Sequence, residues 1–272
     1  MYPYKSIVHI LLSGWALFMT QAIIAAGVTE KTVLSRLLIH IVYNNVPYKL
    51  GLETGWGFAC QIEGLNKTVL FDTGGNGDIL LSNMQRLGLD PESIEIIVLS
   101  HIHSDHTGGL GDLLKRNPDV IVYVPESFPA SFQREVTRLG AVTETVSGPR
   151  QLVDSVFSTG EMGSAIKEQA LIVDTAEGLI VITGCAHPNV AEMAEQAQSY
   201  FGKKIDLLMG GFHLSNRSDA EIRAIIQRLK ALGVRKVAPS HCTGDNAIRI
   251  FRDEWSGDFI EGGLGAIIDV PR

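Results

Sequence analysis

A histidine-rich loop directly after an apolar run is the feature of this sequence that most constrains its fold. Residues 101–106 read His-Ile-His-Ser-Asp-His, and they follow a run of mostly Ile, Val and Leu at residues 94–100. The apolar run predicts a buried strand. The Thr-Gly-Gly at residues 107–109 frees the backbone to turn before a helix expected over residues 110–117. The strand end therefore presents four side chains whose nitrogen and oxygen atoms are zinc-type ligands. These are His101, His103, Asp105 and His106.

The same setting recurs at three further histidines. Apolar runs at residues 179–183, 205–209 and 237–240 each lead through small residues or directly into a histidine. The three histidines are His187, His213 and His241. Because strand ends converge in layered α/β proteins, four such loops can build one site, or one pair of adjacent metal positions. A chance cluster on the surface is the alternative, and the repetition argues against it. His9 and His40 lie in apolar runs and are interpreted as structural.

The order of the apolar runs predicts the fold class. Strands are expected at 34–42, 58–63, 68–71, 94–100, 120–124, 170–173, 179–183, 205–209 and 237–240, and helices at 78–87, 110–117, 128–139 and 189–201. A further helix is expected to begin after Ser218, which forms a capping box with Glu221, and to end at Gly233. Strands followed by strand–helix units, twice over, predict an α+β protein in which two sheets pack together with helices outside.

The N-terminal segment has a different composition from the rest of the chain. Lys5 is the only charge before Glu30, and the mostly apolar residues 7–26 end in small side chains. This pattern is typical of a secretory signal peptide at residues 1–27. The apolar stretch is also long enough, at about 20 residues, for an uncleaved membrane anchor. The remaining residues 28–272 contain no Pro/Ser/Gly linker and are expected to form one domain, located in the periplasm, secreted, or anchored to a membrane.

The amino-acid composition indicates which classes of partner the protein can bind. Acidic residues outnumber basic residues by 30 to 23, and the resulting net charge of −7 disfavours nucleic acid. We expect a small-molecule substrate, and contact with a membrane only if the N-terminal segment is uncleaved. The three cysteines are too few and too far apart for a disulfide framework. Cys60 is expected to be a buried small side chain. Cys185 and Cys242 flank the candidate histidines, and either could touch a metal, although packing is favoured for Cys242.

Taken together, these motifs resemble the metallo-β-lactamase superfamily. The His-x-His-x-Asp-His run has an Asp72-Thr-Gly motif upstream and further histidines downstream. The resemblance covers most of the chain after about residue 35, and it implies a four-layer αββα sandwich with a dinuclear metal site at the sheet edge. The motifs at residues 184–187, 210–214 and 241–244 resemble the branch that contains the archaeal dihydropterin ribofuranosylaminobenzene phosphate synthase.

The sequence departs from the superfamily pattern at two places. Cys185 stands where most members have a bridging Asp, and residues 158–161 lack the Gly-His-Thr type of ligand. The resemblance implies that His187 replaces the missing histidine. One metal would then be held by His101, His103 and His187, and the other by Asp105, His106 and His241. The expected cofactor is zinc, one or two ions, with manganese or iron as alternatives. Asp72 is expected to hydrogen-bond a ligand imidazole, or simply to form the turn.

These ligands predict hydrolytic chemistry. A zinc-type ion with an open position supplies hydroxide to a carbonyl carbon or a phosphorus atom. We therefore expect a metal-dependent hydrolase of a phosphoester, lactone or amide. Asp105 would orient the attacking water, and His213 would bind substrate or protonate the leaving group. A pterin-type synthase that forms a carbon–carbon bond and a metal-dependent binding or sensing module are the alternatives. A di-iron redox protein is disfavoured because His103 occupies a position that is Glu in that branch.

Overall fold

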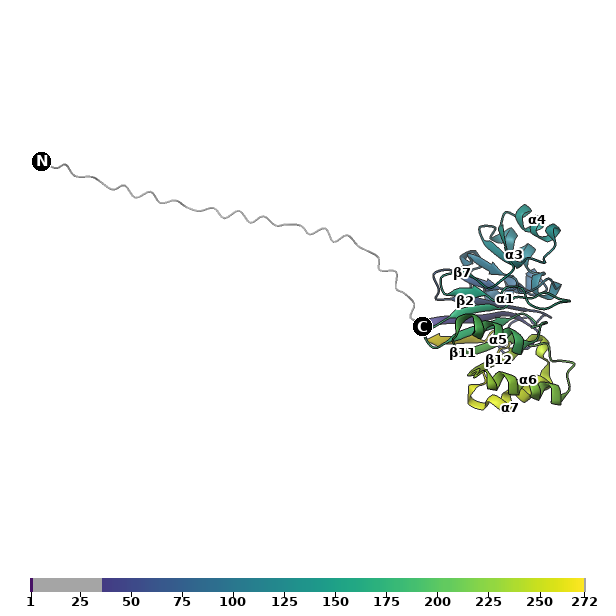
Figure 1. Ribbon diagram of the computed structural model, residues 1–272. Coiled ribbons are helices and arrows are strands. Elements are labelled where there is room, and N and C mark those ends of the chain that lie inside the picture. The colour runs from purple at the N-terminus through teal and green to yellow at the C-terminus, as the bar shows by residue number, and fades with distance from the viewer. Residues whose placement is uncertain (2–35, 272) are drawn as a thin grey trace. The chain divides into compact units, whose positions relative to one another are not determined.

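Two β-sheets stack face to face in the computed structural model, which describes Met1 and residues 36–271 (Figure 1). The predicted signal peptide or anchor at residues 1–27 lies, apart from Met1, outside the described residues. Within the described part of the chain, every helix is too short or too polar to cross a bilayer.

The first sheet has seven strands in the order β13-β1-β2-β3-β4-β5-β6. The strands from β3 to β6 run parallel to one another, and the others pair antiparallel. Their bounds are β1 Arg36–Asn44, β2 Phe58–Glu63, β3 Val69–Phe71, β4 Ile96–Val98, β5 Ile121–Pro125, β6 Val142–Val146 and β13 Ile267–Pro271.

The second sheet has six strands in the order β12-β11-β10-β9-β8-β7. Here β10, β11 and β12 are parallel, and the remaining pairs are antiparallel. Their bounds are β7 Arg150–Val153, β8 Val156–Ser158, β9 Leu171–Asp174, β10 Leu179–Thr183, β11 Ile205–Gly211 and β12 Lys236–Ser240.

Helices cover the outer face of each sheet (Figure 1). The first sheet carries α1 Gly77–Leu87, α3 Leu110–Arg116 and α4 Ala130–Arg138, and the second carries α5 Val190–Phe201, α6 Asp219–Ala231 and α7 Asp245–Trp255. The short elements are α2 Ser104–Thr107, η1 Pro91–Ser93, η2 His241–Thr243 and η3 Ser256–Asp258. The helix expected at residues 128–139 begins only at Ala130, directly after Pro129.

Side chains that point alternately to the two faces of each strand form three apolar layers. In β4, Ile96 and Val98 pack between the sheets, whereas Ile97 packs under the helices. In β10, Ile180 and Ile182 face the other sheet, and Val181 faces the helices. Because successive strand residues point to opposite faces, each strand contributes to two layers. The predicted four-layer αββα arrangement is confirmed.

Candidate metal centre

The candidate ligands lie on loops that follow parallel strands of both sheets. The loop at residues 101–106 follows β4, and the loop at residues 184–187 follows β10. His213 and His241 follow β11 and β12. The six predicted metal ligands gather in two neighbouring groups. The two groups touch through His101 of one and His106 of the other, whose ring centroids are 4.2 Å apart. The site therefore lies where the carboxyl ends of the two sheets' parallel strands meet.

The first group, called here the trio, consists of His101, His103 and His187. Their ligand atoms lie within 4.8 Å of one another, and His101 Nε2 is 3.1 Å from His103 Nδ1. The His187 ring lies 4.8 Å from each of the other two rings, centroid to centroid. Nε2 of His187 is buried and has no hydrogen-bond partner among the described residues. Three imidazoles that face one another, one with an unused buried nitrogen, fit a bound cation.

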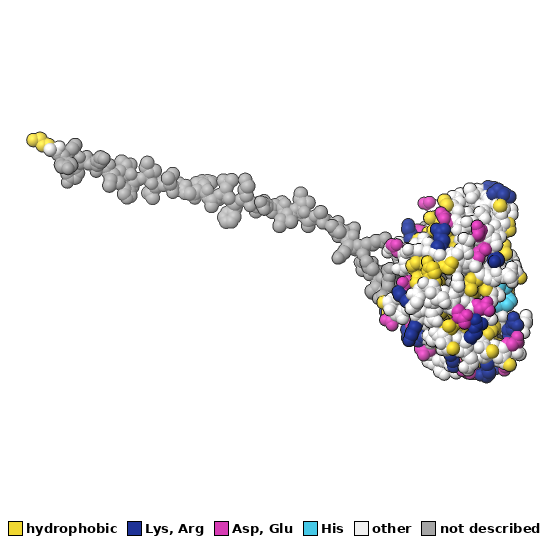
Figure 2. Space-filling model, in the orientation of Figure 1, with side chains coloured by type: hydrophobic (Ala, Val, Ile, Leu, Met, Phe, Trp, Pro, Cys, Tyr) yellow, Lys and Arg dark blue, Asp and Glu magenta, His cyan; other side chains and the backbone are white. Residues whose placement is uncertain are grey.

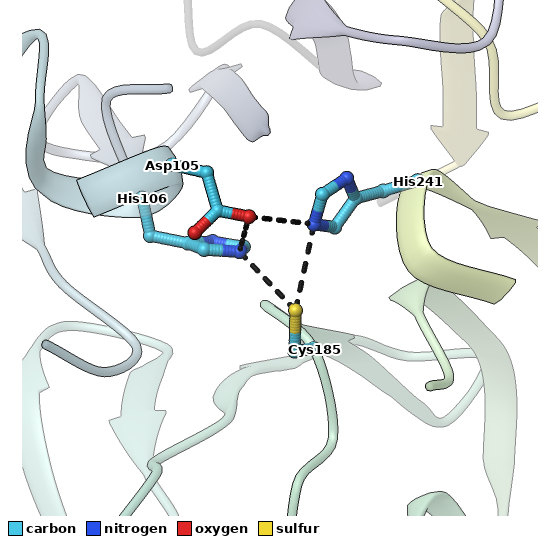
Figure 3. Close-up of side chains that lie close together, drawn as sticks. All are labelled: Asp105, His106, Cys185 and His241. Carbon is cyan, nitrogen blue, oxygen red and sulfur yellow. Dashed lines mark hydrogen bonds and ion pairs between the residues drawn. The ribbon is translucent and has the colours of Figure 1, made fainter. Parts of the chain in front are cut away.

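The second group, called here the quartet, consists of Asp105, His106, Cys185 and His241 (Figure 3). The Cys185 sulfur lies 3.3 Å from His106 Nε2 and 3.4 Å from His241 Nε2. Asp105 Oδ2 lies 3.6 Å and 3.3 Å from the same two nitrogens. Ligand atoms around a tetrahedral zinc ion are roughly 3.3–3.6 Å apart, and these four separations match that spacing. Cys185 therefore joins the three predicted members of this group.

Three of the candidate ligand rings are oriented by hydrogen bonds from Nδ1. His101 Nδ1–H donates to Ser100 Oγ over 2.9 Å, and His241 Nδ1–H donates to Asn45 Oδ1 over 2.7 Å. His106 Nδ1–H donates to the buried Asp72 carboxylate over 2.7 Å. These bonds turn Nε2 of each ring toward the cluster and increase its basicity as a ligand. Asp72 makes the predicted hydrogen bond, and it also forms the turn, since its φ is +56°. The role of Asn45 was not predicted.

A buried carboxylate, that of Glu168, holds the loop at residues 184–187. Its oxygens accept hydrogen bonds of 2.8–3.1 Å from four consecutive backbone N–H groups, beginning at Gly184. Burial raises the pKa of Glu168 to about 7, against the opposing effect of these bonds. Ala186 in this loop has a φ of +59°, and the turn directs Cys185 to the quartet and His187 to the trio. No sequence pattern marks Glu168, a single acidic residue in a loop.

The protonation states differ between the two groups. Burial and the neighbouring histidines lower the pKa of His187 to about 4 and that of His101 still further. His101 and His187 are therefore neutral at pH 7 and ready to bind a cation. In the quartet, burial opposes a raised pKa of His106, but the charge of Asp72 prevails. The hydrogen bond with Cys242, together with burial, raises the pKa of the Cys185 thiol. A cation that binds the quartet must therefore displace protons.

Asp105 remains ionised in this setting. Burial alone would raise the pKa of its carboxyl group, but the hydrogen bond with His241 and the charge of His106 lower it to about 2. The carboxylate is thus charged at every pH at which the protein is expected to work.

His213 lies at the mouth of the cluster rather than inside it. Its side chain is exposed, and its ring centroid is 4.5 Å from that of His187. Both rings line a cavity of about 370 Å³ that also contacts Arg217 and the first residues of α5. Figure 2 shows histidine side chains that reach the surface. A larger cavity of about 580 Å³ lies along α1 and η1, but none of the candidate ligands lines it.

Comparisons with known proteins match the fold described above. Residues 62–241 match the Metallo-beta-lactamase superfamily. The chain is 31% identical over 263 residues to 7,8-dihydropterin-6-methyl-4-(beta-D-ribofuranosyl)-aminobenzene-5'-phosphate synthase of Methanocaldococcus jannaschii, with 79% of this chain and 90% of the relative covered. Among solved structures, Tm1679, a metal-dependent hydrolase of the beta-lactamase superfamily, has a TM-score of 0.75 and 28% identity, with 87% of this chain and 100% of Tm1679 covered. Human tRNase Z, short form, shares the fold with a TM-score of 0.60 and 15% identity, over 86% of this chain and 100% of the enzyme.

Proposed function

Because the chain belongs to the metallo-beta-lactamase superfamily, we propose that it is a metal-dependent hydrolase that binds zinc through its clustered histidines. The fold supports this class at the family level, since its solved relatives include a metal-dependent hydrolase. Members of the superfamily bind metal ions, and the trio and the quartet are groups that could hold one. The resemblance predicted from the sequence is confirmed at the level of the superfamily and of its synthase-containing branch.

The observation that carries the proposal is the difference in size between the two groups. The quartet offers four ligand atoms, which is a complete tetrahedral set, whereas the trio offers three. Structural zinc sites are closed by four protein ligands, and catalytic sites keep one position open. A zinc-type ion with an open position lowers the pKa of a water molecule and polarises the oxygen under attack. The trio is therefore assigned the hydrolytic role, and the quartet the supporting role.

Two side chains of the protein would assist the reaction. Asp105 is ionised and partly exposed at the edge of the quartet, so its carboxylate can accept a hydrogen bond from the attacking water and orient it. The hydrogen bond with Cys242 raises the pKa of His213, so a larger fraction of its imidazole is protonated near neutral pH. His213 can then donate its proton to the leaving group from the mouth of the cluster.

The cavity beside His187 and His213 is proposed to take the substrate. Its volume of about 370 Å³ suits a small molecule. Its walls combine apolar side chains with Arg217, Glu192 and Glu221, so they accept polar substrates of either sign. We propose a phosphoester, lactone or amide as the substrate, with no nucleic-acid partner, and a location outside the cytoplasm.

A second candidate function is a pterin-type synthase reaction. It is favoured by the 31% identity to the Methanocaldococcus jannaschii synthase over 90% of that enzyme. The same trio and quartet would serve it, but the reaction would form a bond between two substrates rather than consume water.

The test combines metal analysis with an activity screen. Purified protein is expected to contain a transition metal, chiefly zinc, and to hydrolyse at least one class among phosphodiesters, lactones and β-lactams. His103→Ala should lose metal and activity together. His40→Gln serves as the matched control, because His40 lies in β1 beside Glu63 and in neither group. Metal-loaded protein that hydrolyses none of these classes but condenses pterin-type substrates would favour the synthase.

The assignment of His213 is tested in the same assay. His213→Ala should lower kcat roughly a hundredfold, the usual contribution of a general acid, while the tightly bound metal is retained. Loss of the tightly bound metal would show instead that His213 belongs to the trio or the quartet.

A further inference from the structure

A third set of ligand atoms overlaps both groups at the mouth of the site. One atom each from Cys185, His187 and His213 lie within 4.8 Å of one another. Cys185 also belongs to the quartet and His187 to the trio, whereas His213 belongs to neither. The three residues come from two loops, after β10 and β11, that lie side by side because these strands pair in parallel.

This third set extends from the interior to the solvent. Cys185 is buried, with 4% of its surface exposed, His187 is half-buried, and His213 is exposed. The imidazole of His213 lies beside that of His187, with ring centroids 4.5 Å apart and both rings facing the 370 Å³ cavity. A cation that arrives from solvent would therefore meet His213 and His187 before Cys185.

The spacing and the chemistry of the set suit a zinc-type ion. Ligand atoms within 4.8 Å of one another need to approach by about 1 Å to reach the spacing of a tetrahedral site. Rotation of the exposed His213 side chain can supply much of this movement. A thiolate ligand favours zinc and other soft cations over manganese and magnesium, and the thiol proton of Cys185 would be released to solvent on binding.

His187 cannot coordinate one cation in the third set and another in the trio at the same time. A neutral imidazole has one unprotonated nitrogen, because the other nitrogen carries the proton. His187 can therefore bind one cation at a time, although a thiolate such as that of Cys185 can bridge two. A cation in the third set removes His187 from the trio, whose ion is then held by His101 and His103 alone. The same cation occupies the His213 side chain that faces the substrate cavity.

We propose that Cys185, His187 and His213 form a third position for a zinc-type cation, which fills when zinc is in excess and inhibits the enzyme. This inference rests on the proposed function, since the inhibition acts by removing a ligand from the trio. Zinc above the amount held by the trio and the quartet lowers activity, whereas an equal excess of manganese does not.

The experiment counts bound metal and does not depend on activity alone. Wild-type protein and His213→Asn are titrated with zinc in equilibrium dialysis and with cobalt while the thiolate-to-cobalt absorption band is followed. Asparagine is chosen because His213 has a φ of +54°, a conformation that asparagine tolerates well. His213→Ala is the second variant, and Asn216→Ala, an exposed change in the same loop, is the control.

The expected result is that both His213 variants bind one zinc ion fewer than the wild type at saturation and keep the tightly bound metal. The last addition of cobalt should increase the thiolate band in the wild type and the control only. Equal zinc stoichiometry in wild type and His213→Asn would overturn the third position, as would the loss of tightly bound metal from that variant. If the wild type binds no metal tightly, the proposed function itself fails, and this outcome is distinct from the other two.

Discussion

The buried carboxylate of Asp72 joins the loop after β4 to the ring of His106. Its oxygens accept hydrogen bonds of 2.7 Å from the backbone N–H and the hydroxyl of Ser100 and from His106 Nδ1–H. Asp72→Asn keeps the shape but removes the charge and replaces one acceptor with a donor. We expect metal affinity to fall about 10- to 100-fold, as is usual when a partner of a ligand histidine is removed.

The measurement for Asp72→Asn is competition for zinc against a chelator of known affinity. Asp78→Asn is the matched control, because it makes the same exchange at an exposed position in the first turn of α1. Unchanged zinc affinity in Asp72→Asn would mean that Asp72 serves the turn alone.

The buried side chain of Glu168 should make the stability of the metal-free protein depend on pH. Its pKa is raised from about 4.5 to about 7 by burial, so between these values the folded, metal-free protein binds more protons than the unfolded chain. The contribution of Glu168 to the free energy of unfolding is therefore full below pH 4.5 and is lost as the pH rises to 7. Glu168→Gln does not titrate. The stability of the metal-free wild type relative to this variant should fall by a few kcal/mol across that window, at about 1.4 kcal/mol per pKa unit.

Denaturant unfolding of both metal-free proteins at several pH values provides the measurement. Glu161→Gln, a change of the same kind at a more exposed position, is the control. A difference in stability that is constant from pH 4.5 to 7 would contradict the assignment.

At the scale of elements, the strands with strict apolar character could be predicted from the sequence. β2 and β10 have the predicted bounds, and β4 lies within its predicted range. β6 and β7 were not predicted, because edge positions leave Thr143, Glu144 and Gln151 partly or fully exposed and the apolar pattern is lost. β8, β13 and α7 were also missed, although α7 has apolar residues at helical spacing. Short strands such as β8 depend on pairing with neighbours that are distant in sequence.

Part of the candidate site, like part of the fold, could be predicted from the sequence. A histidine that follows an apolar run can be recognised from the sequence alone. The six predicted ligands, five histidines and Asp105, all lie in the trio or the quartet. The sequence indicates that Cys185 could touch a metal, but only the folded chain reveals that its sulfur lies between His106 and His241. Glu168 and Asn45 contact the site across 16 to 196 residues of sequence. A single acid or amide in a loop has no periodic pattern, so such contacts are specified by tertiary packing alone.

The N-terminus of α6 gives a prediction that is separate from the metal site. Ser218 accepts a hydrogen bond from the backbone N–H of Glu221, and the Glu221 side chain accepts one from the backbone N–H of Ser218. Ser218→Ala removes one half of this capping box and should lower the free energy of unfolding by about 1 kcal/mol. Thermal unfolding measures the change, with Asn216→Ala as control. Metal content should not change, and a loss of metal would indicate that α6 is coupled to the site.

At the scale of the whole molecule, the N-terminal segment predicts export. The charge at Lys5, the apolar residues 7–26 and the small residues that follow are typical of a signal peptide. Mass spectrometry of protein from its natural cell should find an N-terminus near Val28, or intact protein in the membrane fraction. Replacing Leu11 and Leu12 with arginine should abolish export, because charges interrupt the apolar segment. Full-length wild-type protein in the soluble cytoplasmic fraction would contradict both versions.

The quartet draws its members from both sheets, and this has a consequence for the order of folding. Cys185 lies 79 residues from His106 and 56 residues from His241 in the sequence. Bringing such distant segments together costs loop-closure entropy that is repaid only when the sheets dock. We therefore expect the quartet to assemble late, after the transition state for folding. Zinc should slow unfolding, as measured by stopped-flow dilution into denaturant, and leave the folding rate nearly unchanged. The cation would then stabilise the protein after it has folded, and it would not guide folding.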